Sequence, residues 1–519
     1  MSRYYIGFDC GTMGTKVAIF SEDSTLVADA YRPHKIDYPK PGWAEMDPDQ
    51  YYRVVTEGIK ECMDKSKINP GDVRAISCSG IVCGFVPIND NWNPVGPYFP
   101  YLDTRSREEV KYVSENVEPL WEEENGNSII GAFIPPMIMK WLLKNRKDMI
   151  KKTKKIVTGC HYVMGKLGGL KTKDAYIDWA HLSGWVLGFD GRKRDWSPRQ
   201  LELLEIPIEL LPKVKKPWDI VGSLTKKEAE LTGLAEGIPL VAGAGDMQQS
   251  CIGSGIVDLG VCSDVAGTAS NFNITVDDFK KEITAKKTFM YAMDTMGDYY
   301  LAWSVIPGGG LSLRWFRDEL MGKKGDDNFY EEMDRMAENV PIGSKYSLFL
   351  PFLQGRTNPV WSNASAGWLG LYASNDSASL WRSMLESIAF EYLSWMNVLR
   401  EVGVKPIKIV GQGGGSKGNI WNQIKADILN IPYLTLKRSE QAVLGDALLA
   451  AYGVGDVKNF QKTAREWAEI KETFMPDREN NSIYMKIYKQ REKIINGPIK
   501  ETFDMLAELH EIDIPEKKM

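Results

Sequence analysis

Two acidic residues, Asp9 and Asp246, stand beside glycine-rich turns at the ends of apolar segments that favour β-strands. Asp9 follows the run 4–8 and precedes the turn 10–14, and Asp246 follows the run 239–245, which closes on Gly-Ala-Gly. Phosphoryl transfer to an alcohol needs one acid that holds magnesium and another that accepts the hydroxyl proton. The pair therefore favours a phosphoryl-transfer site, although a lone aspartate at a strand end is more often a turn former or a cap.

The turn after Asp9 has the composition of a phosphate-binding hairpin. Gly11 and Gly14 let backbone amides approach a ligand closely and permit positive φ. Thr12 and Thr15 add hydroxyl donors, and Lys16 adds a positive charge. Together with an acid that could face a metal, these residues suit a phosphate–magnesium site. The alternative is an ordinary hairpin with a glycine turn.

A second glycine cluster, 413–418, supports a different hypothesis. Its sequence GGGSKG matches the Gly-x-Gly-x-x-Gly pattern, follows an expected strand at 407–410 and opens a helix that ends near Leu429. Dinucleotides are bound in this context, so an NAD-dependent oxidoreductase is a competing interpretation. The unit lies late in the chain, however, with little room after it for the rest of a doubly wound sheet. No Gly-x-x-x-x-Gly-Lys-Ser/Thr segment occurs, which argues against a P-loop kinase.

A third group of residues has the composition of a sugar-binding surface. Trp43 and Glu45 lie in a loop rich in Pro and Gly, and Asp103 and Arg105 follow an aromatic segment. Sugars stack on aromatic faces and exchange hydrogen bonds with charged groups through their hydroxyls. The alternative is that Trp43 anchors a surface loop and that Asp103 and Arg105 form a local salt bridge.

The elements that must position these residues repeat one pattern in the two halves of the chain. The segment 4–20 reads as strand, turn and strand, and a third strand at 25–31 is expected to pair antiparallel. The segment 261–275 repeats the strand, Gly-Thr turn and strand about 250 residues later, which predicts two related domains with a boundary near 250–258. Further helices or strands are expected at 48–64, 73–78, 85–88, 107–157, 185–196, 376–402, 407–410 and 444–452, with a charged helical tail from 477.

Length and composition exclude several classes of protein. The 519 residues are enough for two domains of about 250 residues, and 43% hydrophobic and 26% charged residues are ordinary for a globular protein. A net charge of −5 gives no electrostatic footprint for nucleic acid or an anionic membrane. No apolar run is long enough to cross a bilayer, and the N-terminus lacks a signal-peptide pattern, so the cytoplasm is the expected location.

Cysteines and histidines form no recognisable metal motif along the chain. Because no Cys-x-x-Cys pair occurs, neither a zinc ribbon nor a disulfide framework is predicted. With only four histidines, a histidine-based metal site is not expected either. The seven cysteines are scattered at positions 10, 62, 78, 83, 160, 251 and 262.

Motifs along nearly the whole chain resemble those of the FGGY family of carbohydrate kinases. IGFDCGTMGTKVAIF is similar to the family's first phosphate motif, and DVAGTASNF is similar to the second. AGAGDMQQSCIGSGIV resembles the segment that carries the catalytic base, and GGGSKGNIWNQIKADILNIP resembles the adenosine motif. PGWAEMDPDQYY and AGWLGLYASNDSASLWRSMLES resemble two further signatures, and all of these segments occur in family order.

This resemblance implies an α/β, actin-like ATPase architecture with two ribonuclease-H-like domains, and ATP and sugar bound in the cleft between them. The N-terminal domain, 1–254, would hold the sugar and the catalytic base. The C-terminal domain, 255–519, would hold the nucleotide and carry a helical tail. The implied reaction is ATP-dependent phosphorylation of a hydroxyl of a small sugar or polyol, with Mg²⁺ as cofactor. Closure of the two domains would exclude water and limit wasteful ATP hydrolysis.

The same resemblance implies a role for each residue that matches a family motif. Asp246 is the general base, and Asp9 is the magnesium ligand. The implied nucleotide-binding residues are Gly11, Thr12, Thr15, Lys16, Gly267, Thr268, Gly310, Gly414, Gly415 and Asn419. The implied substrate-binding residues are Trp43, Val82, Cys83, Asp103, Arg105 and Asp246. In this scheme the GGGSKG unit approaches adenosine and not a nicotinamide pyrophosphate.

Departures from the family pattern concentrate in the sugar-binding half. Val82 and Cys83 precede a glycine where xylulose kinases show Met-His-Gly, and the Arg-Glu pair of glycerol kinases is absent from this loop. Ile138 stands in place of a lysine of the N-terminal signature, and Ser379 replaces a polar residue of the C-terminal one. The Gly-Glu-Arg-x-Pro loop is altered at 355–359.

Despite these departures, the resemblance to the family favours a ketopentose such as xylulose as the substrate. The alternative substrates are a quorum-signalling sugar, gluconate, ribulose, erythritol and glycerol. A non-catalytic, sugar-binding relative is a further hypothesis, which the altered sugar loop raises. The expected partners are a small-molecule sugar and ATP, and neither nucleic acid nor a membrane is expected. The resemblance to the family also implies a homodimer.

Overall fold

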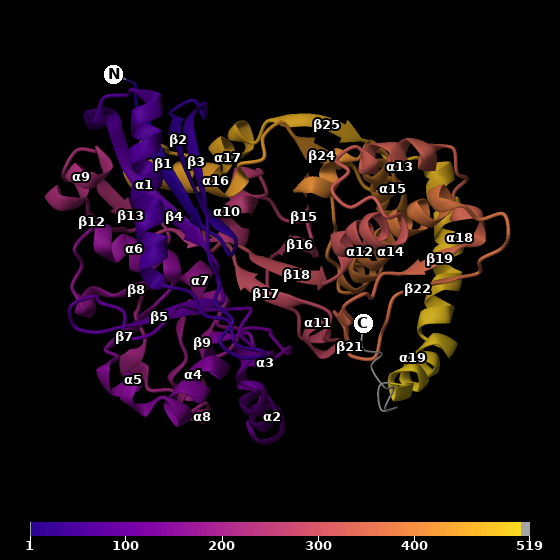
Figure 1. The fold of residues 1–519 in the computed structure, drawn as a ribbon, viewed down its shortest axis with the longest axis horizontal. Coiled ribbons are helices and arrows are strands. Elements are labelled where there is room, and N and C mark those ends of the chain that lie inside the picture. The colour runs from indigo at the N-terminus through magenta and orange to yellow at the C-terminus, as the bar shows by residue number, and fades with distance from the viewer. Residues whose placement is uncertain (1, 510–519) are drawn as a thin grey trace.

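The computed structural model describes residues 2–509 and folds them into two lobes, each built on a mixed seven-stranded sheet (Figure 1). The first sheet has the order β12-β13-β4-β1-β2-β3, with β14 beside β4. Its strands are β1 (Tyr4–Cys10), β2 (Gly14–Ser21), β3 (Leu26–Pro33), β4 (Val73–Gly80), β12 (Ile220–Ser223), β13 (Pro239–Val241) and β14 (Ala244–Gly245). The second sheet has the order β17-β18-β16-β15-β23-β24-β25. Its strands are β15 (Val261–Ala266), β16 (Ser270–Val276), β17 (Met290–Met293), β18 (Tyr300–Ile306), β23 (Lys408–Gln412), β24 (Tyr433–Leu436) and β25 (Ile470–Phe474).

The predicted opening hairpin is present, and its register sorts the candidate residues onto two faces. β1 pairs antiparallel with β2, which puts Asp9 opposite Lys16 and Cys10 opposite Thr15. β1 runs parallel to β4, with Asp9 beside Ser79, and β3 continues the antiparallel order as predicted. Because side chains alternate along a strand, Asp9 and Lys16 emerge on one face of the sheet, and Cys10 and Thr15 on the other.

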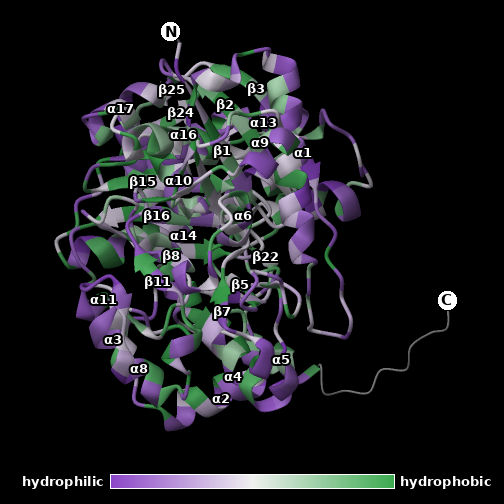
Figure 2. Cartoon of the chain, turned by 90° about the vertical axis from the view of Figure 1, so that its left-hand side faces the viewer, coloured by the Kyte–Doolittle hydropathy of each residue, from purple (hydrophilic) through white to green (hydrophobic). Residues whose placement is uncertain are grey.

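Helix α1 (Pro48–Ser66) covers one face of this hairpin and begins where the sequence predicts. The Asp47 side chain accepts a hydrogen bond from the Asp49 amide, and Pro48 occupies the first helical position. The buried side of α1 packs on β2 and β3. Figure 2 shows hydrophobic residues concentrated on the inner strands and hydrophilic residues over outer helices such as α1.

Helix α16 (Gln441–Gly453) comes from late in the chain and returns to the first lobe, where it packs on β1, β4 and α10 (Asp246–Gly253) (Figure 1). Its apolar side chains, and those of α17 (Phe460–Trp467), belong to the same core cluster as Tyr5 of β1 and Ala75 of β4. The expected domain boundary lies between residues 254 and 255. The packing differs from this expectation, because residues 441–467 lie with the N-terminal lobe.

Glycines make this close packing of α16 possible. A Cβ atom at Gly445 would lie 2.2 Å from the backbone oxygen of Gln249 on α10. A Cβ atom at Gly7 would lie 2.4 Å from the backbone oxygen of Val443. Helix α16 thus approaches both α10 and β1 to backbone contact, at distances that a larger residue would prevent.

A buried ion pair fixes the centre of the second lobe. Asp264 of β15 contacts the Lys425 ammonium of α15 (Asn419–Leu429) at 2.5 Å. The same carboxylate accepts hydrogen bonds from the Tyr392 and Tyr433 hydroxyls at 2.7 and 2.8 Å. The burial of this charge is therefore compensated by a cation and two donors.

The predicted long helix is α14 (Ser377–Glu401), and its start explains one departure from the family pattern. The Asp376 side chain accepts from the Ser379 amide while the Ser379 hydroxyl engages the Asp376 backbone, which together form a capping box. Ser379 is therefore a helix-capping residue here.

The segment 107–157 is helical only in part. It contains α2 (Arg107–Asn116), α3 (Leu120–Glu124), α4 (Pro135–Asn145), α5 (Lys147–Lys152) and the strand β7 (Lys155–Val157), which pairs with β5 (Gly84–Ile88). Residues 125–134 contain no helix. The prediction of continuous helix is wrong here because Pro135 and Pro136 cannot extend a helix from preceding residues.

The remaining elements include the predicted hairpin within 185–196, formed by β9 and β10. No helix of the described residues is both long and apolar enough to cross a membrane. The remaining bounds are β6 (Phe99–Pro100), α6 (Gly159–Leu167), β8 (Tyr176–Asp178), α7 (Trp179–Ser183), β9 (Phe189–Asp190), β10 (Asp195–Trp196), α8 (Pro198–Leu203), β11 (Lys213–Lys215), α9 (Lys226–Thr232), α11 (Lys281–Ala285), α12 (Gly309–Trp315), α13 (Phe329–Glu338), β19 (Leu348–Leu350), β20 (Arg356–Thr357), β21 (Val360–Trp361), β22 (Gly367–Leu369), α18 (Arg478–Ile495) and α19 (Pro498–Glu508).

The substitution Gly445→Ala tests the contact between α16 and α10. Because the added methyl group would overlap the Gln249 carbonyl, we expect a destabilisation of about 1–3 kcal/mol, measured as a lower urea midpoint and Tm. Gly367→Ala is the matched control, since a Cβ atom at Gly367 meets no atom within 4 Å. Equal losses in the two variants would contradict this account of the packing.

Candidate active site

Three carboxyl groups, those of Asp9, Asp246 and Asp446, gather where β1, β4, α10 and α16 meet. Ser79 Oγ lies 3.1 Å from Asp9 Oδ1 and 2.9 Å from Asp446 Oδ2. Gln249 Nε2 donates to the other oxygen of Asp446 at 3.0 Å. Because a hydroxyl has a single proton to donate, Ser79 can donate to only one of these two carboxyl groups at a time.

Burial and mutual repulsion raise the pKa of all three carboxyl groups. Burial raises the pKa of Asp9 to about 7, and the neighbouring charge of Asp246 adds to this effect. Burial likewise raises the pKa of Asp246 to about 6. Asp446 is fully buried, and burial together with the charge of Asp9 places its pKa well above the ordinary value. Burial therefore favours the protonated form of Asp446, which would leave the Ser79 proton for Asp9.

No lysine or arginine of the described chain forms an ion pair with these three carboxyl groups. Lys16, which faces the same side of the hairpin as Asp9, pairs with Glu440 at 3.1 Å and with Asp29 at 3.4 Å. A group of oxygen donors that forms no ion pair with lysine or arginine has the composition of a divalent-cation site, because Mg²⁺ and Ca²⁺ prefer oxygen ligands.

Asp246 begins helix α10 directly after β14, and the loop 82–83 lies next to it. The Met247 amide donates to Asp246 Oδ1 at 2.7 Å, and the helix N-terminus favours the ionised carboxylate. Burial raises the pKa of Cys83 to about 12, and the charge of Asp246 contributes. A Cβ atom at Gly245 would lie 2.3 Å from Val82 Cγ1. The structure therefore brings Val82 and Cys83 beside the expected base.

The expected sugar-binding residues Trp43, Glu45, Asp103 and Arg105 also come together. The Arg105 guanidinium lies 3.9 Å from the centre of the Trp43 ring and donates to Glu45 at 2.7 Å. It also donates to Asp103 at 2.6 Å, and both of these side chains are fully enclosed. The expectation that Asp103 and Arg105 contact a sugar directly therefore differs from the structure, because each side chain is buried in the pair. Trp43 and Glu45 remain half-buried.

The turn after β1 presents some of its expected phosphate ligands and withdraws one. Gly11 and Thr12 are half-buried, and the Gly11 amide closes the turn on Gly14 at 3.1 Å. Thr15 is only 1% exposed, and its hydroxyl lies 2.8 Å from His34 Nε2. The expected contact between the Thr15 hydroxyl and phosphate is not supported, because strand alternation turns this side chain into the core, away from Asp9.

The second Gly-Thr turn lies between β15 and β16 and is exposed at Gly267 and Thr268. A Cβ atom at Gly310 would lie 1.9 Å from the Gly267 oxygen, and the Leu311 amide donates to the Thr268 oxygen at 2.8 Å. Gly310 therefore lets the start of α12 support this turn from behind.

The GGGSKG unit, 413–418, lies at the same end of the second sheet. A Cβ atom at Gly415 would lie 2.4 Å from Ala266 Cβ, and Ala266 directly precedes the second Gly-Thr turn. Gly414 and Asn419 are exposed, and a Cβ atom at Gly414 would meet nothing within 4 Å. The second phosphate turn and the expected adenosine segment are therefore neighbours.

The expected nucleotide-binding residues of the first lobe and those of the second lobe do not contact each other directly. Within residues 2–509, no hydrogen bond or ion pair joins the turn 11–16 to the segments 267–268 or 413–419. A contact between the two sets is thus left to a bound molecule.

The second sheet is not the sheet of a dinucleotide-binding fold. Its parallel pairs are β15–β23 and β23–β24, while β16, β18, β17 and β25 pair antiparallel with their neighbours. A doubly wound, mostly parallel sheet is required for that fold. The oxidoreductase hypothesis is therefore set aside.

Three residues of the site, Ser79, Gln249 and Asp446, were not found from the sequence. Asp446 lies in the segment 444–452, which was expected only as a helix or strand. The available signal was an acidic side chain in an otherwise apolar helix, where an unpartnered charge is costly. Ser79 and Gln249 carried no comparable signal.

Two departures from the family pattern have structural roles. Ile138 is fully buried in the core of the first lobe. Arg356, in the altered loop 355–359, pairs with the buried Glu391 of α14 at 3.0 Å. Asn358 of the same loop is buried and donates to the Thr288 oxygen at 3.0 Å. The altered loop therefore anchors the second lobe.

Comparison with known proteins relates both lobes to one family. Residues 4–253 match the N-terminal domain of the FGGY family of carbohydrate kinases, and residues 264–454 match its C-terminal domain. A xylulose kinase of Staphylococcus epidermidis is 24% identical over 506 residues, which cover 97% of this chain and 98% of that protein. An autoinducer-2 kinase of Escherichia coli is 26% identical over 504 residues, which cover 93% and 92%.

Solved structures share the fold of the whole chain. A gluconate kinase of Lactobacillus acidophilus superimposes with a TM-score of 0.88 at 22% identity and covers 98% of this chain and 100% of its own. A xylulose kinase of the same species gives a TM-score of 0.87 at 22% identity, with coverage of 95% and 98%. The predicted α/β, two-domain, actin-like architecture is confirmed.

The variant Asp246→Asn tests the electrostatic state of the site through stability. The folded-state pKa of Asp246, about 6, is raised above the ordinary 3.8, so its contribution to stability is full below pH 3.8 and is lost as the pH rises through about 6. We expect the neutral Asn to stabilise the protein by about 1–3 kcal/mol at pH 8 and to have little effect near pH 4.

The measurement is Tm against pH, with the exposed residue Asp327 changed to Asn as the control. A gain that is equal at all pH values, or no gain at pH 8, would show that the Asp246 carboxylate is not held against its preference for protonation.

Proposed function

Because the chain belongs to the FGGY family of carbohydrate kinases, we propose that it transfers a phosphoryl group from ATP to a hydroxyl of a ketopentose such as xylulose. The observation that carries the proposal is the group of buried carboxyl groups at the strand ends, which forms no ion pair with a lysine or arginine of the described chain. Relatives named for xylulose support the ketopentose, and relatives named for autoinducer-2 and gluconate support two of the alternatives.

Asp9 is the proposed ligand of Mg²⁺, and the residues around it fit that ion. The donors are oxygen atoms, and no lysine or arginine within residues 2–509 competes for the carboxylate. Ser79 donates to Asp9 and thereby fixes the orientation of the carboxylate, while the protonated Asp446 holds Ser79. When bound, Mg²⁺ would neutralise part of the charge of the ATP phosphates.

Asp246 is the proposed general base. A pKa of about 6 leaves its carboxylate mostly ionised at neutral pH and makes it a stronger proton acceptor than an ordinary aspartate. The Met247 amide engages Oδ1, so Oδ2 is the oxygen that we assign to accept the proton of the sugar hydroxyl. The position of Asp246 at the start of α10 holds the carboxylate without a flexible loop.

The nucleotide would be bound from both lobes. Gly11 and Thr12 would offer amides and a hydroxyl to the phosphates from the first lobe, and Gly267 and Thr268 would do so from the second. A Cβ atom at Gly414 would meet nothing within 4 Å, so there is room for the adenosine beside this residue. The supporting residues are proposed to be Lys16, Gly310, Gly415 and Asn419.

The sugar would lie between Asp246 and the loop 82–83. Cys83 Sγ donates to the Gly184 oxygen at 3.1 Å, so this loop contributes a shaped wall more than a free donor. Trp43 offers a ring face on which a sugar could stack, and the enclosed Arg105 and Asp103 hold that ring in place. The homodimer and the cytoplasmic location stay predictions.

A coupled assay of ADP release over pentuloses, hexuloses, polyols and aldonates tests this function. We expect a pentulose to stimulate ADP release most strongly in the wild-type protein. Asp246→Asn is expected to lower kcat by about 10²–10⁴-fold, because a base positioned at the hydroxyl is lost. Wild-type kcat/KM is expected to fall below pH 6, where Asp246 becomes protonated.

Asp327→Asn, which lies in an exposed loop, should leave the turnover unchanged. Unchanged turnover in Asp246→Asn would remove this residue from the mechanism. Stimulation by an aldonate or polyol alone would replace the ketopentose by one of the alternatives, and no stimulation by any sugar would favour the non-catalytic relative.

A further inference from the structure

The hairpin of β17 and β18 belongs to the second sheet and lies where the two lobes meet (Figure 1). Met293, at the end of β17, belongs to the core cluster of the first lobe, and Met296 packs against that cluster. The Met293 amide donates to Ser183 Oγ of α7 at 2.7 Å, and Trp179 Nε1 of α7 donates to the Asp294 oxygen at 3.0 Å. The turn of this hairpin is therefore held by the first lobe, while its strands belong to the second.

Thr295, in the same turn, begins a series of hydrogen bonds that leads to the acids. Its hydroxyl donates to Gln249 Oε1 of α10 at 3.3 Å. Gln249 Nε2 donates to Asp446 Oδ1 at 3.0 Å, and Asp446 Oδ2 lies 2.9 Å from Ser79 Oγ. Ser79 Oγ lies in turn 3.1 Å from Asp9 Oδ1. This unbroken series, the Thr295–Asp9 relay, connects the hairpin of the second sheet to the proposed metal ligand.

The members of the relay between its two ends are enclosed, and so is Thr295. Thr295 is 1% exposed, and Gln249, Asp446 and Ser79 are fully buried. Bulk water therefore cannot replace a lost partner, and a buried polar group left unpaired is costly. Without the Thr295 hydroxyl, the Gln249 amide would lose one of the two contacts that hold it, and the donor to Asp446 would be less well placed.

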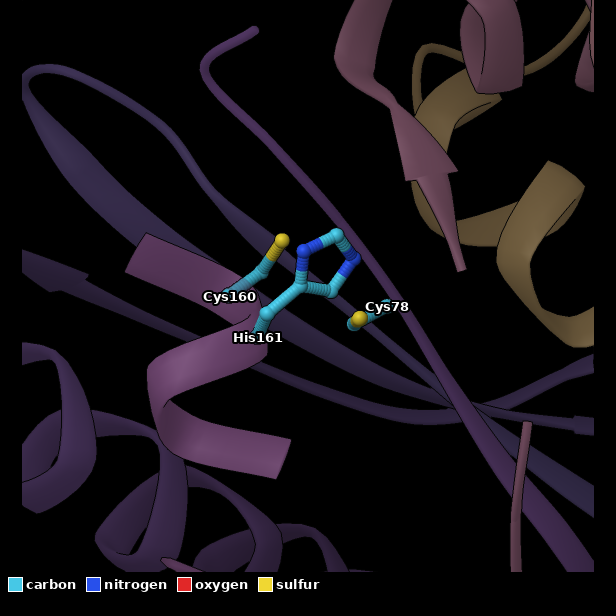
Figure 3. Close-up of side chains that lie close together, drawn as sticks. All are labelled: Cys78, Cys160 and His161. Atoms are coloured by element: carbon cyan, nitrogen blue, oxygen red, sulfur yellow. The ribbon is translucent and has the colours of Figure 1, made fainter. Parts of the chain in front are cut away.

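The backbone of Ser79 is held from the opposite face of the sheet. Cys78 directly precedes Ser79 on β4, and its side chain lies beside those of Cys160 and His161 in the first turn of α6 (Figure 3). Because successive side chains of a strand point to opposite faces, Ser79 is turned toward α16 and Asp446. With the backbone fixed in this way, the direction of the Ser79 hydroxyl is set by its hydrogen-bond partners.

We propose that Thr295 and Gln249 are positioning residues that transmit the placement of the second lobe to Asp9. The proposal rests on the proposed function, because it takes Asp9 as the ligand of Mg²⁺. Thr295 orients the Gln249 amide, the amide orients the Asp446 carboxyl group, and Ser79 then holds Asp9. A contiguous network of this kind can carry energetic coupling between separate elements. The affinity of the first lobe for the metal therefore depends on a hydroxyl of the second lobe that does not touch the metal.

Binding of Mn²⁺ in the presence of ADP and without sugar tests this proposal. Mn²⁺ prefers the same oxygen donors as Mg²⁺, and its free ion is measured by electron paramagnetic resonance. Thr295→Val keeps the branched shape of the side chain and removes the hydroxyl, so we expect the dissociation constant for Mn²⁺ to rise by about 3–10-fold. Thr295→Ser keeps the hydroxyl and should bind Mn²⁺ nearly as tightly as the wild-type protein.

Gln249→Leu interrupts the relay at its next member and should weaken Mn²⁺ binding at least as much as Thr295→Val. In the double variant, Thr295→Val should add little to the effect of Gln249→Leu, because both changes break the same series. If Gln249→Leu does not fold, the two variants of Thr295 decide the question alone.

Thr284→Val is the matched control. Thr284 is also buried in the second lobe, and its hydroxyl donates to the Gly126 oxygen of the first lobe at 2.9 Å, at a contact that involves none of the three acids. This variant should bind Mn²⁺ like the wild-type protein.

Equal effects of Thr295→Val and Thr284→Val, or Mn²⁺ binding in Thr295→Val that matches the wild-type protein, would overturn the proposal. A wild-type protein that binds no Mn²⁺ with ADP would overturn the proposed metal site and the relay with it. Because sugar is absent from the measurement, failure of the relay is distinct from a failure to phosphorylate a sugar.

Discussion

A single hydroxyl between two buried carboxyl groups constrains the whole site. Ser79 has one proton to share between Asp9 and Asp446, and Asp446 comes from a helix that returns from late in the chain. The glycines at 7 and 445 let that helix approach to backbone contact. The orientation of Asp9 therefore depends on Asp446, which is more than four hundred positions away in the sequence. The site thus couples the start of the chain to a helix from late in the chain.

Burial gives these acids their chemistry and also makes them costly to fold. The same desolvation that raises the pKa of Asp246 to about 6 makes it a better proton acceptor and disfavours its ionised form. Active sites commonly combine such perturbed groups with a loss of stability. In this chain the rest of the first lobe offsets that loss through apolar packing, since α16 and α17 join its core. The second lobe combines an apolar core of its own with compensated charges such as the pair of Asp264 and Lys425.

Local pattern was enough to predict the hairpins, the long helices and the two related halves, because each depends on alternation, capping or turn residues within a few positions. The family resemblance placed Asp9 and Asp246, and the fold brings them together. Register and long-range packing decided the rest. Strand alternation alone turned Thr15 into the core, and the enclosure of Arg105 depended on the loop of Trp43 and Glu45 meeting the loop 103–105. The buried group of His161, Asp178 and His181 joins two segments whose spacing along the chain does not predict that they meet.

The central claim is that the site moves a phosphoryl group from ATP to a sugar hydroxyl, with the first-lobe acids assembled around it. Phosphorus NMR of the protein with ATP, Mg²⁺ and xylulose measures this most directly, because it identifies the acceptor of the phosphoryl group. The account predicts that the γ-phosphate signal of ATP decays as ADP and a sugar phosphomonoester appear in equal amounts. Decay to inorganic phosphate alone, or no decay with xylulose or any other sugar of the panel, would contradict it.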